Sequence, residues 1–209
     1  MKDIIIIGAG GFGKEILWLA KRLNRQIIGF LDDTPEKQNT KILGYPVIGK
    51  IDDFNKFGNA EFIIAIGSPR AREFIFNKMT LQYSPNFVTL IDPSAIIGEN
   101  VNIGEGCLIC AGAILTVDIS IGHQVIINLN STIGHDVIIE DFVTIAPNVS
   151  VSGNVILANK VELGTNATIR EKVMIEQGAM VGMGSVITKT VEANKLIAGN
   201  PARAIKTLD

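Results

Sequence analysis

An aliphatic residue stands at every sixth position from Ile91 to Ile187, seventeen times without a break. A second small or branched residue usually precedes it by two positions, and glycine often follows it, as at Gly98 and Gly134. Neither a helix, with a period of 3.6 residues, nor a strand, with a period of 2, gives a period of six. Hexads of this kind are typical of a parallel β-helix, in which three hexads form one triangular coil and the aliphatic side chains stack inside. We expect the glycine after each aliphatic residue to serve a turn with positive φ.

The N-terminal residues have a different pattern, in which apolar strands alternate with helices. We expect strands at 2–7, 26–31 and 62–66 and helices at 14–23 and 69–79, with Ser68 as the N-cap of the second helix. Alternating βαβ units predict a small parallel sheet covered by helices. The chain is therefore predicted to contain an α/β Rossmann-like domain over residues 1–84 and a β-helix over residues 85–209, which residues 196–203 close.

A glycine-rich turn joins the first strand to the first helix. Gly8, Gly10 and Gly13 match the pattern G-x-G-x-x-G, and Asp32 and Asp33 follow about twenty positions later, as in a dinucleotide-binding fingerprint. Backbone N–H groups at the helix N-terminus favour a phosphate, and a carboxylate can accept hydrogen bonds from a ribose or base. A tight turn without a ligand is the alternative. Because the domain is too short for six strands, a mononucleotide or nucleotide sugar fits it better than NAD.

The chain has two histidines, and each follows an Ile-Gly pair at the same hexad position. His123 and His135 are two hexads apart, so they lie on different faces of a three-sided coil. Asp136 follows His135, and a neighbouring carboxylate can orient an imidazole. Asn128 precedes His135 by seven residues. His135 is therefore the better candidate for a general base, whereas an exposed turn is the favoured interpretation of His123.

Composition and charge exclude several classes of function. The formal net charge is −2 and the basic residues are scattered, which argues against a nucleic-acid-binding protein. No stretch reaches the roughly 20 apolar residues of a membrane helix, and we expect a cytoplasmic protein. Cys107 and Cys110 form a C-x-x-C pair, but Cys107 occupies an inward hexad position and no second pair completes a metal site. We therefore expect packing roles for the cysteines and no metal.

The ordered set of motifs resembles a known family. It comprises the glycine turn, Phe30-Leu31-Asp32-Asp33, Ala65-Ile66-Gly67, the hexads, Ile133-Gly134-His135-Asp136, Ser152-Gly153-Asn154-Val155 and Ala198-Gly199-Asn200-Pro201-Ala202. Together these motifs resemble the NeuD/PglD-like sugar O-/N-acetyltransferases of the hexapeptide-repeat acyltransferase superfamily, over essentially the whole chain. The resemblance implies a left-handed β-helix, a homotrimer, acetyl-CoA as donor and a nucleotide-linked 4-amino-4,6-dideoxy sugar as acceptor, for surface glycan or polysaccharide synthesis.

The resemblance also implies roles for individual residues. His135 would be the general base, Asp136 would polarise it and Asn128 would help to shape the site. The acceptor nucleotide would lie against Gly10, Gly11, Phe12, Asp32, Asp33 and Gly67. The coenzyme would lie near Thr144, Gly153, Thr165, Gly182 and Met183. Many relatives carry histidine where this chain has Phe12, so a contact made by that histidine is lost and sugar or nucleotide preference can differ.

Three alternatives remain open at this point. A hydroxyl acceptor, as in sialic acid O-acetylation, would keep the fold and the donor. An NAD-dependent oxidoreductase could be built on the glycine turn, although a second catalytic domain is missing from the sequence. A non-catalytic solenoid scaffold would satisfy the hexads but would not explain the His-Asp pair.

Overall fold

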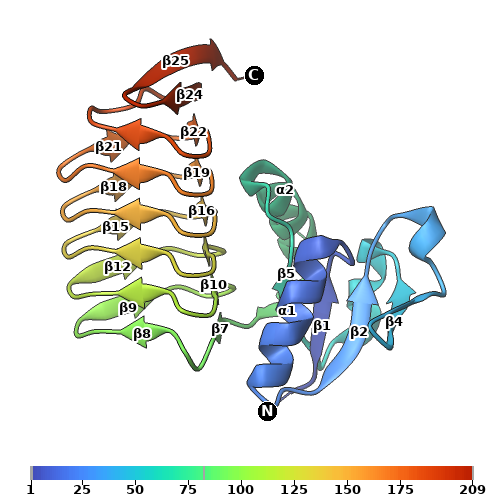
Figure 1. Cartoon of the computed structure of the whole chain (residues 1–209). Coiled ribbons are helices and arrows are strands. Elements are labelled where there is room, and N and C mark those ends of the chain that lie inside the picture. Colours follow the sequence, from blue (N-terminus) through green and yellow to red (C-terminus); the bar gives the residue numbers. More distant parts are fainter. Residues whose placement is uncertain (1, 82, 209) are drawn as a thin grey trace. The chain divides into compact units, whose positions relative to one another are not determined.

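The computed structural model describes residues 2–81 and 83–208 (Figure 1). The chain forms two compact units, Met1–Leu90 and Ile91–Asp209. The division falls later than the boundary expected after Ser84, because residues 86–87 form a strand that pairs with the sheet of the first unit. Within the described residues, no helix is both long enough and apolar enough to cross a membrane.

The first unit is built on a six-stranded, largely parallel sheet in the order β3-β4-β2-β1-β5-β6. Only β3 is antiparallel to its neighbour, because it forms a hairpin with β4. Neither strand of this hairpin was predicted. The strands are β1 (Ile4–Ile7), β2 (Ile27–Leu31), β3 (Lys41–Ile42), β4 (Tyr45–Gly49), β5 (Glu61–Ile64) and β6 (Asn86–Phe87).

The helical segments of the first unit are α1 (Gly11–Arg22), η1 (Pro35–Lys37), η2 (Ile51–Phe57) and α2 (Pro69–Thr80). Side chains from η2 and α2 pack with Ile5 and Ile7 of β1 in one cluster, so both segments cover the same side of the sheet. The alternation of a strand directs Ile4 and Ile6 to the opposite side, and both are fully buried. The continuous apolar run of β1 is explained by burial on both faces.

The predicted elements of this unit exist, with shifted ends. Helix α1 begins at Gly11 instead of residue 14, because the last glycines of the turn already form its first turn. Ser68 occupies the N-cap position of α2, but its side chain makes no capping hydrogen bond. The strand predicted at 62–66 ends at Ile64, and Ile66 and Gly67 instead belong to the loop before α2.

The second unit is a left-handed parallel β-helix with three flat faces (Figure 1). Face 1 contains β7 (Leu90–Ile91), β10 (Leu108–Ile109), β13 (Ile126–Ile127), β16 (Thr144–Ile145), β19 (Glu162–Leu163), β22 (Met180–Val181), β24 (Lys195–Gly199) and β25 (Ala202–Thr207). Face 2 contains β8 (Ile96–Ile97), β11 (Ile114–Leu115), β14 (Thr132–Ile133), β17 (Ser150–Val151), β20 (Thr168–Ile169) and β23 (Val186–Ile187). Face 3 contains β9 (Val101–Ile103), β12 (Ile119–Ile121), β15 (Ile138–Ile139), β18 (Ile156–Leu157) and β21 (Met174–Ile175).

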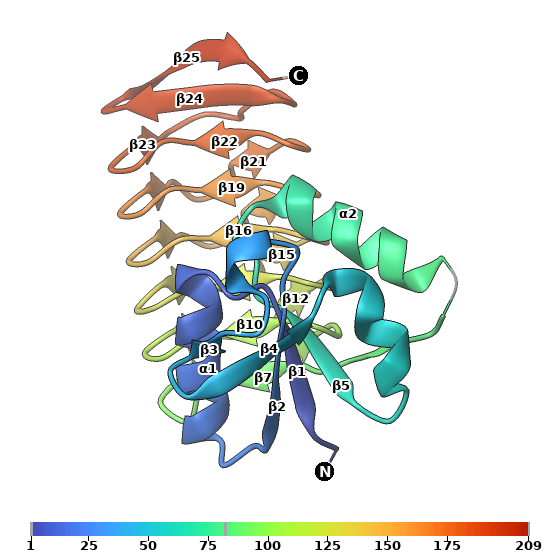
Figure 2. The same ribbon diagram turned by 90° about the vertical axis from the view of Figure 1, so that its right-hand side faces the viewer.

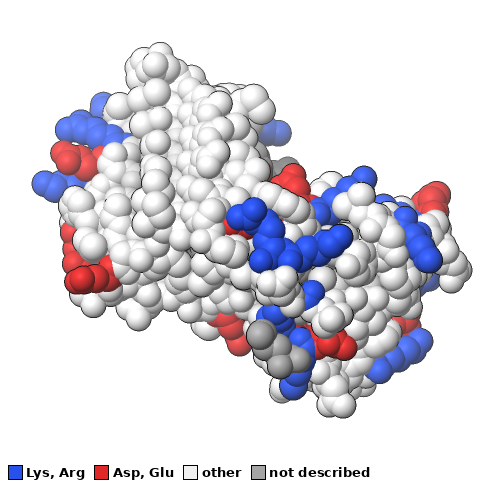
Figure 3. Space-filling model, turned by 60° about the horizontal axis from the view of Figure 1, so that its bottom comes forward, with Lys and Arg blue, Asp and Glu red and all other residues white. Residues whose placement is uncertain are grey.

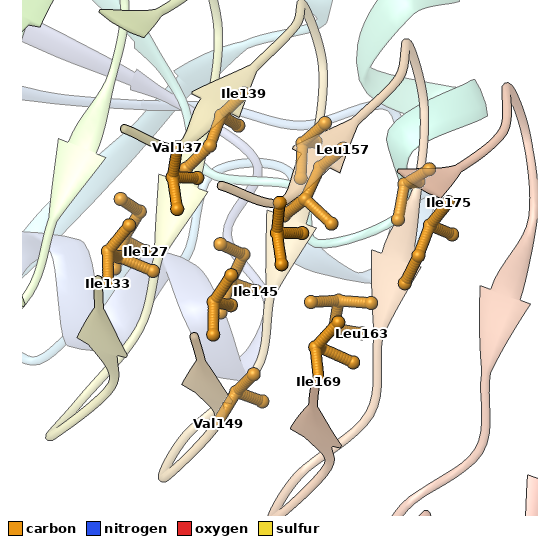
Figure 4. Close-up of a cluster of buried hydrophobic side chains, with 14 of the residues drawn as sticks. Ile127, Ile133, Val137, Ile139, Ile145, Val149, Leu157, Leu163, Ile169 and Ile175 are labelled. Atoms are coloured by element: carbon orange, nitrogen blue, oxygen red, sulfur yellow. The ribbon is translucent and has the colours of Figure 1, made fainter. Parts of the chain in front are cut away.

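The strands pair with a register of 18 residues, as three hexads per coil require. Ile109 lies opposite Ile127, and Ile127 lies opposite Ile145. The hexad aliphatics from Ile109 to Ile187 are buried in one continuous core, stacked coil on coil (Figure 4). Ile97 is 37% exposed. The first coil has a neighbouring coil on one side only, so its aliphatic positions are less well covered.

The role predicted for the glycines after the aliphatic residues was wrong. Positive φ occurs instead at the third residue after the aliphatic positions from Ile97 to Val181, as at Asp136 with φ of 56°. Asparagine, aspartate, glycine or another residue stands there. Asparagine and aspartate tolerate this region better than most side chains. Gly98, Gly134 and similar residues are required for a different reason. A Cβ at Gly134 would lie 2.7 Å from the backbone nitrogen of the next coil, at Gly153.

The C-terminal hairpin closes the solenoid, as predicted for residues 196–203. Strand β24 extends face 1 in parallel with β22, and β25 returns antiparallel to β24 (Figure 2). Ile197 of β24 is buried against the last coil. In the view of Figure 3, blue Lys and Arg and red Asp and Glu side chains lie close to one another in several places, whereas a broad ridged area carries no charged side chain.

Candidate active site

The His-Asp pair lies on the corner between faces 2 and 3, which we call corner 2. His135 and Asp136 follow β14, and the left-handed conformation of Asp136 turns its carboxylate back toward the imidazole. His135 Nδ1 and Asp136 Oδ2 are 2.7 Å apart. Because an ionised carboxylate only accepts hydrogen bonds, this contact favours the imidazole tautomer that has its proton on Nδ1 and its lone pair on Nε2. The side chain of His135 is 60% exposed.

Gly153 lies directly against the His135 ring, one coil along the axis. A Cβ at Gly153 would be 2.5 Å from Nε2 and 2.6 Å from Cε1 of His135. The two residues are 18 positions apart, and Asn154 N–H donates to the His135 carbonyl at 2.9 Å, which fixes the coils in this register. Only glycine leaves space for the imidazole in this position. The structure thus brings one residue predicted to bind the coenzyme into contact with the predicted base.

His123 lies elsewhere and has a structural role. It follows β12 on the corner between faces 3 and 1, here called corner 3, so the prediction that the two histidines lie apart is confirmed. The ring nitrogen Nδ1 of His123 accepts the backbone N–H of Glu105 at 3.2 Å, and the backbone N–H of His123 donates to Asp141 Oδ1 at 2.7 Å. His123 therefore links neighbouring coils.

The other predicted residues of the solenoid gather on and beside the corner between faces 1 and 2, here called corner 1. Asn128, Thr165, Gly182 and Met183 follow face 1 strands at this corner, and Thr144 lies within β16 on face 1. Met183 is 79% exposed, whereas Thr144 is buried. Asn128 Oδ1 accepts the N–H of Leu129, and no hydrogen bond joins Asn128 to His135 within the described residues. In one chain, the predicted residues thus divide between corners 1 and 2.

In the first unit, the predicted nucleotide residues meet at the carboxyl edge of the parallel strands. The glycine turn follows β1, the two aspartates follow β2 and Gly67 lies beyond β5. The neighbouring strands hold this edge together, since Gly8 N–H donates to the Leu31 carbonyl and Ala65 N–H donates to the Ile7 carbonyl, both at 2.8 Å. A ligand site at this edge is typical of open parallel sheets.

The glycines of this edge fall into two groups. A Cβ at Gly13 would lie 2.1 Å from the Gly8 carbonyl oxygen, and Gly8 has φ of 101°, so the fold itself requires both. In contrast, a Cβ at Gly10, Gly11 or Gly67 would meet no heavy atom within 4 Å. The fold does not need these three glycines for packing or for positive φ. They leave open space where a ligand can approach the backbone and the N-terminus of α1.

Asp32 is the central polar residue of this edge. It is 7% exposed, and its Oδ2 accepts the N–H of Ala9 at 2.7 Å and Lys37 Nζ at 3.0 Å. Burial alone would raise the pKa of Asp32, but hydrogen bonds from the Thr34 side chain, Ala9 N–H, Thr34 N–H and Lys37 outweigh it and lower the pKa to about 2. The carboxylate therefore remains ionised throughout the physiological range.

Sequence reasoning missed two residues of this edge. Lys37 reaches Asp32 from the short helix η1. Its distance from Asp32 along the sequence gave no indication of this contact. Arg72 of α2 is buried, and its Nη1 donates to the carbonyls of Ile66 and Gly67 at 2.7 and 3.0 Å. An arginine in the first turn of a helix is unfavourable for the helix dipole, and this would have flagged Arg72 as a residue with another role.

The cysteines and acidic residues show no further site. Cys107 and Cys110 are buried and not disulfide-bonded, and Val125 N–H donates to Cys107 Sγ at 3.4 Å. In the part of the chain that the structure describes, no group of three or more His, Cys, Asp and Glu side chains is placed to hold a metal ion.

Comparisons with known proteins agree with this architecture. Residues 3–79 match the PglD N-terminal domain family. The chain is 33% identical over 116 residues to the UDP-N-acetylbacillosamine N-acetyltransferase of Bacillus subtilis (strain 168). That alignment covers 53% of this chain and 52% of the relative, so it spans about half the length of the curated protein.

Solved structures match over nearly the whole chain. PerB from Caulobacter crescentus, in complex with CoA and GDP-perosamine, has a TM-score of 0.91 at 26% identity and covers 99% of this chain and 98% of its own. The acetyltransferase domain of PglB from Neisseria gonorrhoeae has a TM-score of 0.90 at 29% identity, with 98% and 100% covered. WeeI from Acinetobacter baumannii AYE has a TM-score of 0.88 at 32% identity, again with 98% and 100% covered. The chain therefore belongs to the NeuD/PglD-like family of sugar acetyltransferases, as these full-length matches show together with the hexad solenoid, the His-Asp corner and the glycine turn.

Proposed function

We propose that this protein transfers the acetyl group of acetyl-CoA to the amino group of a nucleotide-linked amino sugar, for surface glycan or polysaccharide synthesis. The observation that carries this proposal is the His135–Asp136 pair on the β-helix, in a chain whose first unit has an open glycine edge. Relatives described as acting on UDP- and GDP-linked amino sugars support the substrate class. A UDP-linked 4-amino-4,6-dideoxy sugar is the proposed acceptor.

In the proposed reaction His135 is the general base. The amine nitrogen forms a bond to the thioester carbonyl carbon, and Nε2 takes the proton that the nitrogen loses. The tetrahedral intermediate then collapses, the C–S bond breaks, and the protonated imidazole returns the proton to the leaving sulfur. Asp136 holds the productive tautomer and stabilises the transient imidazolium. General-base catalysis of this kind contributes roughly 10² to 10⁴ in rate.

The developing oxyanion requires a hydrogen-bond donor. We propose the backbone N–H of Gly153 as this donor. Gly153 lies against the imidazole of His135, and its N–H donates to no acceptor within residues 2–81 and 83–208. We include this N–H in the proposed site beside the thioester carbonyl. It adds a role to the coenzyme contact that the resemblance implied for Gly153.

The proposed site is shared between copies of the chain. Corner 1 carries Asn128 and most of the predicted coenzyme residues, whereas corner 2 carries the base. Corner 1 of one copy can face corner 2 of the next, and this repeated contact closes into a ring in a homotrimer. Light scattering should give three times the mass of the chain, and a monomer that is active at the same concentration would refute a shared site.

The cytoplasm is the proposed compartment, because the proposed donor acetyl-CoA is used there and Cys107 and Cys110 are not disulfide-bonded. The acceptor nucleotide would bind to the open glycines of the first unit, with Phe12 in the first turn of α1 beside it.

The substrate class is tested by incubating the protein and acetyl-CoA with UDP-, dTDP- and GDP-linked 4-amino sugars, followed by mass spectrometry. The proposal predicts a product heavier by one acetyl group on at least one amine. Matched 4-hydroxy sugars and free sialic acid serve as controls for a hydroxyl acceptor. Acetylation of only the hydroxyl compounds would overturn the N-acetyl assignment, and no product on any of them would overturn the acetyltransferase assignment.

A further inference from the structure

The sheet of the first unit has an amino edge, opposite the edge that carries the glycine turn. Helix α1 runs back from the glycine turn to this amino edge and ends at Arg22. Strand β4 is parallel to β2 and begins at the same edge, at Tyr45. Lys21 Nζ lies 5.5 Å from the centroid of the Tyr45 ring, so the helix end meets the β3–β4 hairpin. We define the amino-edge patch as the exposed residues of this region, Trp18, Lys21, Arg22, Lys41 and Leu43.

Trp18 is the single tryptophan of the chain, and it lies on the surface. It is 47% exposed, and Arg22 Cζ lies 5.1 Å from the centroid of its ring. This cation–π contact, one helical turn along α1, holds the indole at a fixed place on the outer face of the helix. Tryptophan is enriched where one part of the ring meets an apolar medium and the other part meets water, as at the boundary of a bilayer.

Leu43 lies at the tip of the β3–β4 hairpin in a conformation that leucine rarely adopts. It forms a two-residue loop with Gly44, and the two residues have φ of 50° and 89°. Asn-Gly is the pair most favoured for a loop with two positive φ values, whereas a leucine side chain is sterically disfavoured there. Leu43 is also 64% exposed. Asparagine would serve the fold better at this position, so the leucine indicates a contact outside the chain.

Cationic side chains accompany these two apolar residues. Lys21 and Lys41 are exposed, and neither takes part in an ion pair within the described residues. Residues 1–90 contain twelve Lys and Arg against nine Asp and Glu, whereas the whole chain has a formal net charge of −2. The first unit is thus the cationic part of the molecule.

This combination fits one class of partner. Separate apolar side chains among lysines suit a layer of anionic headgroups, where the cations meet phosphates and the apolar groups enter the boundary of the hydrocarbon. A stable contact with another protein needs a larger, continuous apolar centre, and the amino-edge patch does not supply one.

We propose that the amino-edge patch docks the protein onto the surface of an anionic phospholipid bilayer. Trp18 and Leu43 enter the headgroup layer, and Lys21 and Lys41 contact the lipid phosphates. The open glycines follow β1 at the opposite edge of the same sheet, so docking leaves them accessible.

Because Trp18 is the single tryptophan, its fluorescence tests the proposal without a label. The full chain is mixed with vesicles of phosphatidylcholine, or of phosphatidylcholine with phosphatidylglycerol, and emission and co-sedimentation are measured on the same samples. The proposal predicts a blue shift of Trp18 emission and co-sedimentation with the anionic vesicles only. Added salt should weaken both effects, because it screens exposed charges.

Two pairs of substitutions separate the patch from net charge. Lys21→Gln/Lys41→Gln should weaken partition onto the anionic vesicles about 25-fold, at roughly fivefold for each basic residue. Lys172→Gln/Lys189→Gln removes the same charge from exposed positions of the second unit and should bind as the wild type does. Thermal unfolding of each variant checks that the fold is retained.

Leu43→Asn gives a readout that a purely structural role would not produce. Partition onto the anionic vesicles should weaken by about 5- to 10-fold, because the partial burial of one leucine is lost. The unfolding temperature should nevertheless rise, because asparagine suits the turn better. Unchanged partition together with a lower unfolding temperature would overturn the role of Leu43 in docking.

The remaining outcomes decide the proposal as a whole. No blue shift with anionic vesicles, or an equal loss in both lysine pairs, would overturn it. Co-sedimentation without a change in Trp18 emission would assign the lipid contact to another surface and would also overturn it. A blue shift with polyglutamate but not with vesicles would identify an acidic protein as the partner instead of a bilayer.

Discussion

The contact between Gly153 and His135 gives a prediction that can be worked out from distances. In Gly153→Ala, the new methyl group would lie 2.5 Å from Nε2 of His135, whereas ordinary contact begins at 3.4 Å. The imidazole must therefore move by about 0.9 Å or rotate away. A displacement of about 1 Å in a reacting group can cost on the order of 10² in rate. We expect kcat to fall about 100-fold.

Stability should hardly change in this variant. The His135 side chain is 60% exposed and can move into solvent, and Gly153 does not have positive φ. Replacing glycine with alanine in a compatible conformation even stabilises by about 0.4–1 kcal/mol, through the unfolded chain. Thermal unfolding should therefore stay within a few degrees of the wild type, which separates displacement of the base from loss of the fold.

The control is a double-mutant cycle with His135→Ala. Steady-state acetyl transfer is measured in the wild type, both single variants and the double variant. If Gly153 acts through the imidazole, Gly153→Ala should have almost no effect once His135 is absent. A further 100-fold loss in that background would mean that the methyl group blocks the coenzyme instead. Wild-type turnover in the single variant would refute the geometric argument.

Three further predictions concern separate parts of the molecule. Ile145→Ala removes a fully buried side chain in the middle of the solenoid and should cost about 2–5 kcal/mol in chemical denaturation; a cost near zero would contradict the stacked core. His123→Ala should leave turnover within about twofold of the wild type, because corner 3 carries no reacting group; a loss as large as that of His135→Ala would reassign the base. Asp32 has a pKa lowered to about 2, so its stabilising contribution is complete above its unfolded pKa and is lost as pH falls toward 2. Asp32→Asn should thus destabilise at pH 7 but have little effect near pH 2, as measured by urea unfolding, and an equal effect at both pH values would contradict the shift.

The fold was predictable because its strongest signal is local and periodic. One aliphatic residue per hexad specifies a coil, and the register of 18 residues follows from three hexads. The residue with positive φ in each turn was not predicted correctly, because glycine after the aliphatic residue was assigned to the left-handed position. Gly134 is instead required by the backbone of the next coil, a long-range contact that the repeat alone does not reveal.

The candidate site was predictable only in part. The pairing of His135 with Asp136 is a contact between neighbours in sequence, and the structure contains it. Lys37 reaches Asp32 because a short helix folds the lysine back, and no periodic pattern encodes that contact. The contact of Gly153 with the imidazole follows from the 18-residue register, so it could have been predicted once the coil was assumed.

The most direct test of the account is acetyl transfer by His135→Ala, with nucleotide and acetyl-CoA binding measured on the same preparation. The account predicts unchanged affinities, an unchanged unfolding temperature and a loss of at least about 10² in kcat, because the base is removed while both binding surfaces remain. Turnover near that of the wild type, with an amino sugar that the wild-type protein acetylates, would contradict the assignment of His135 as the general base.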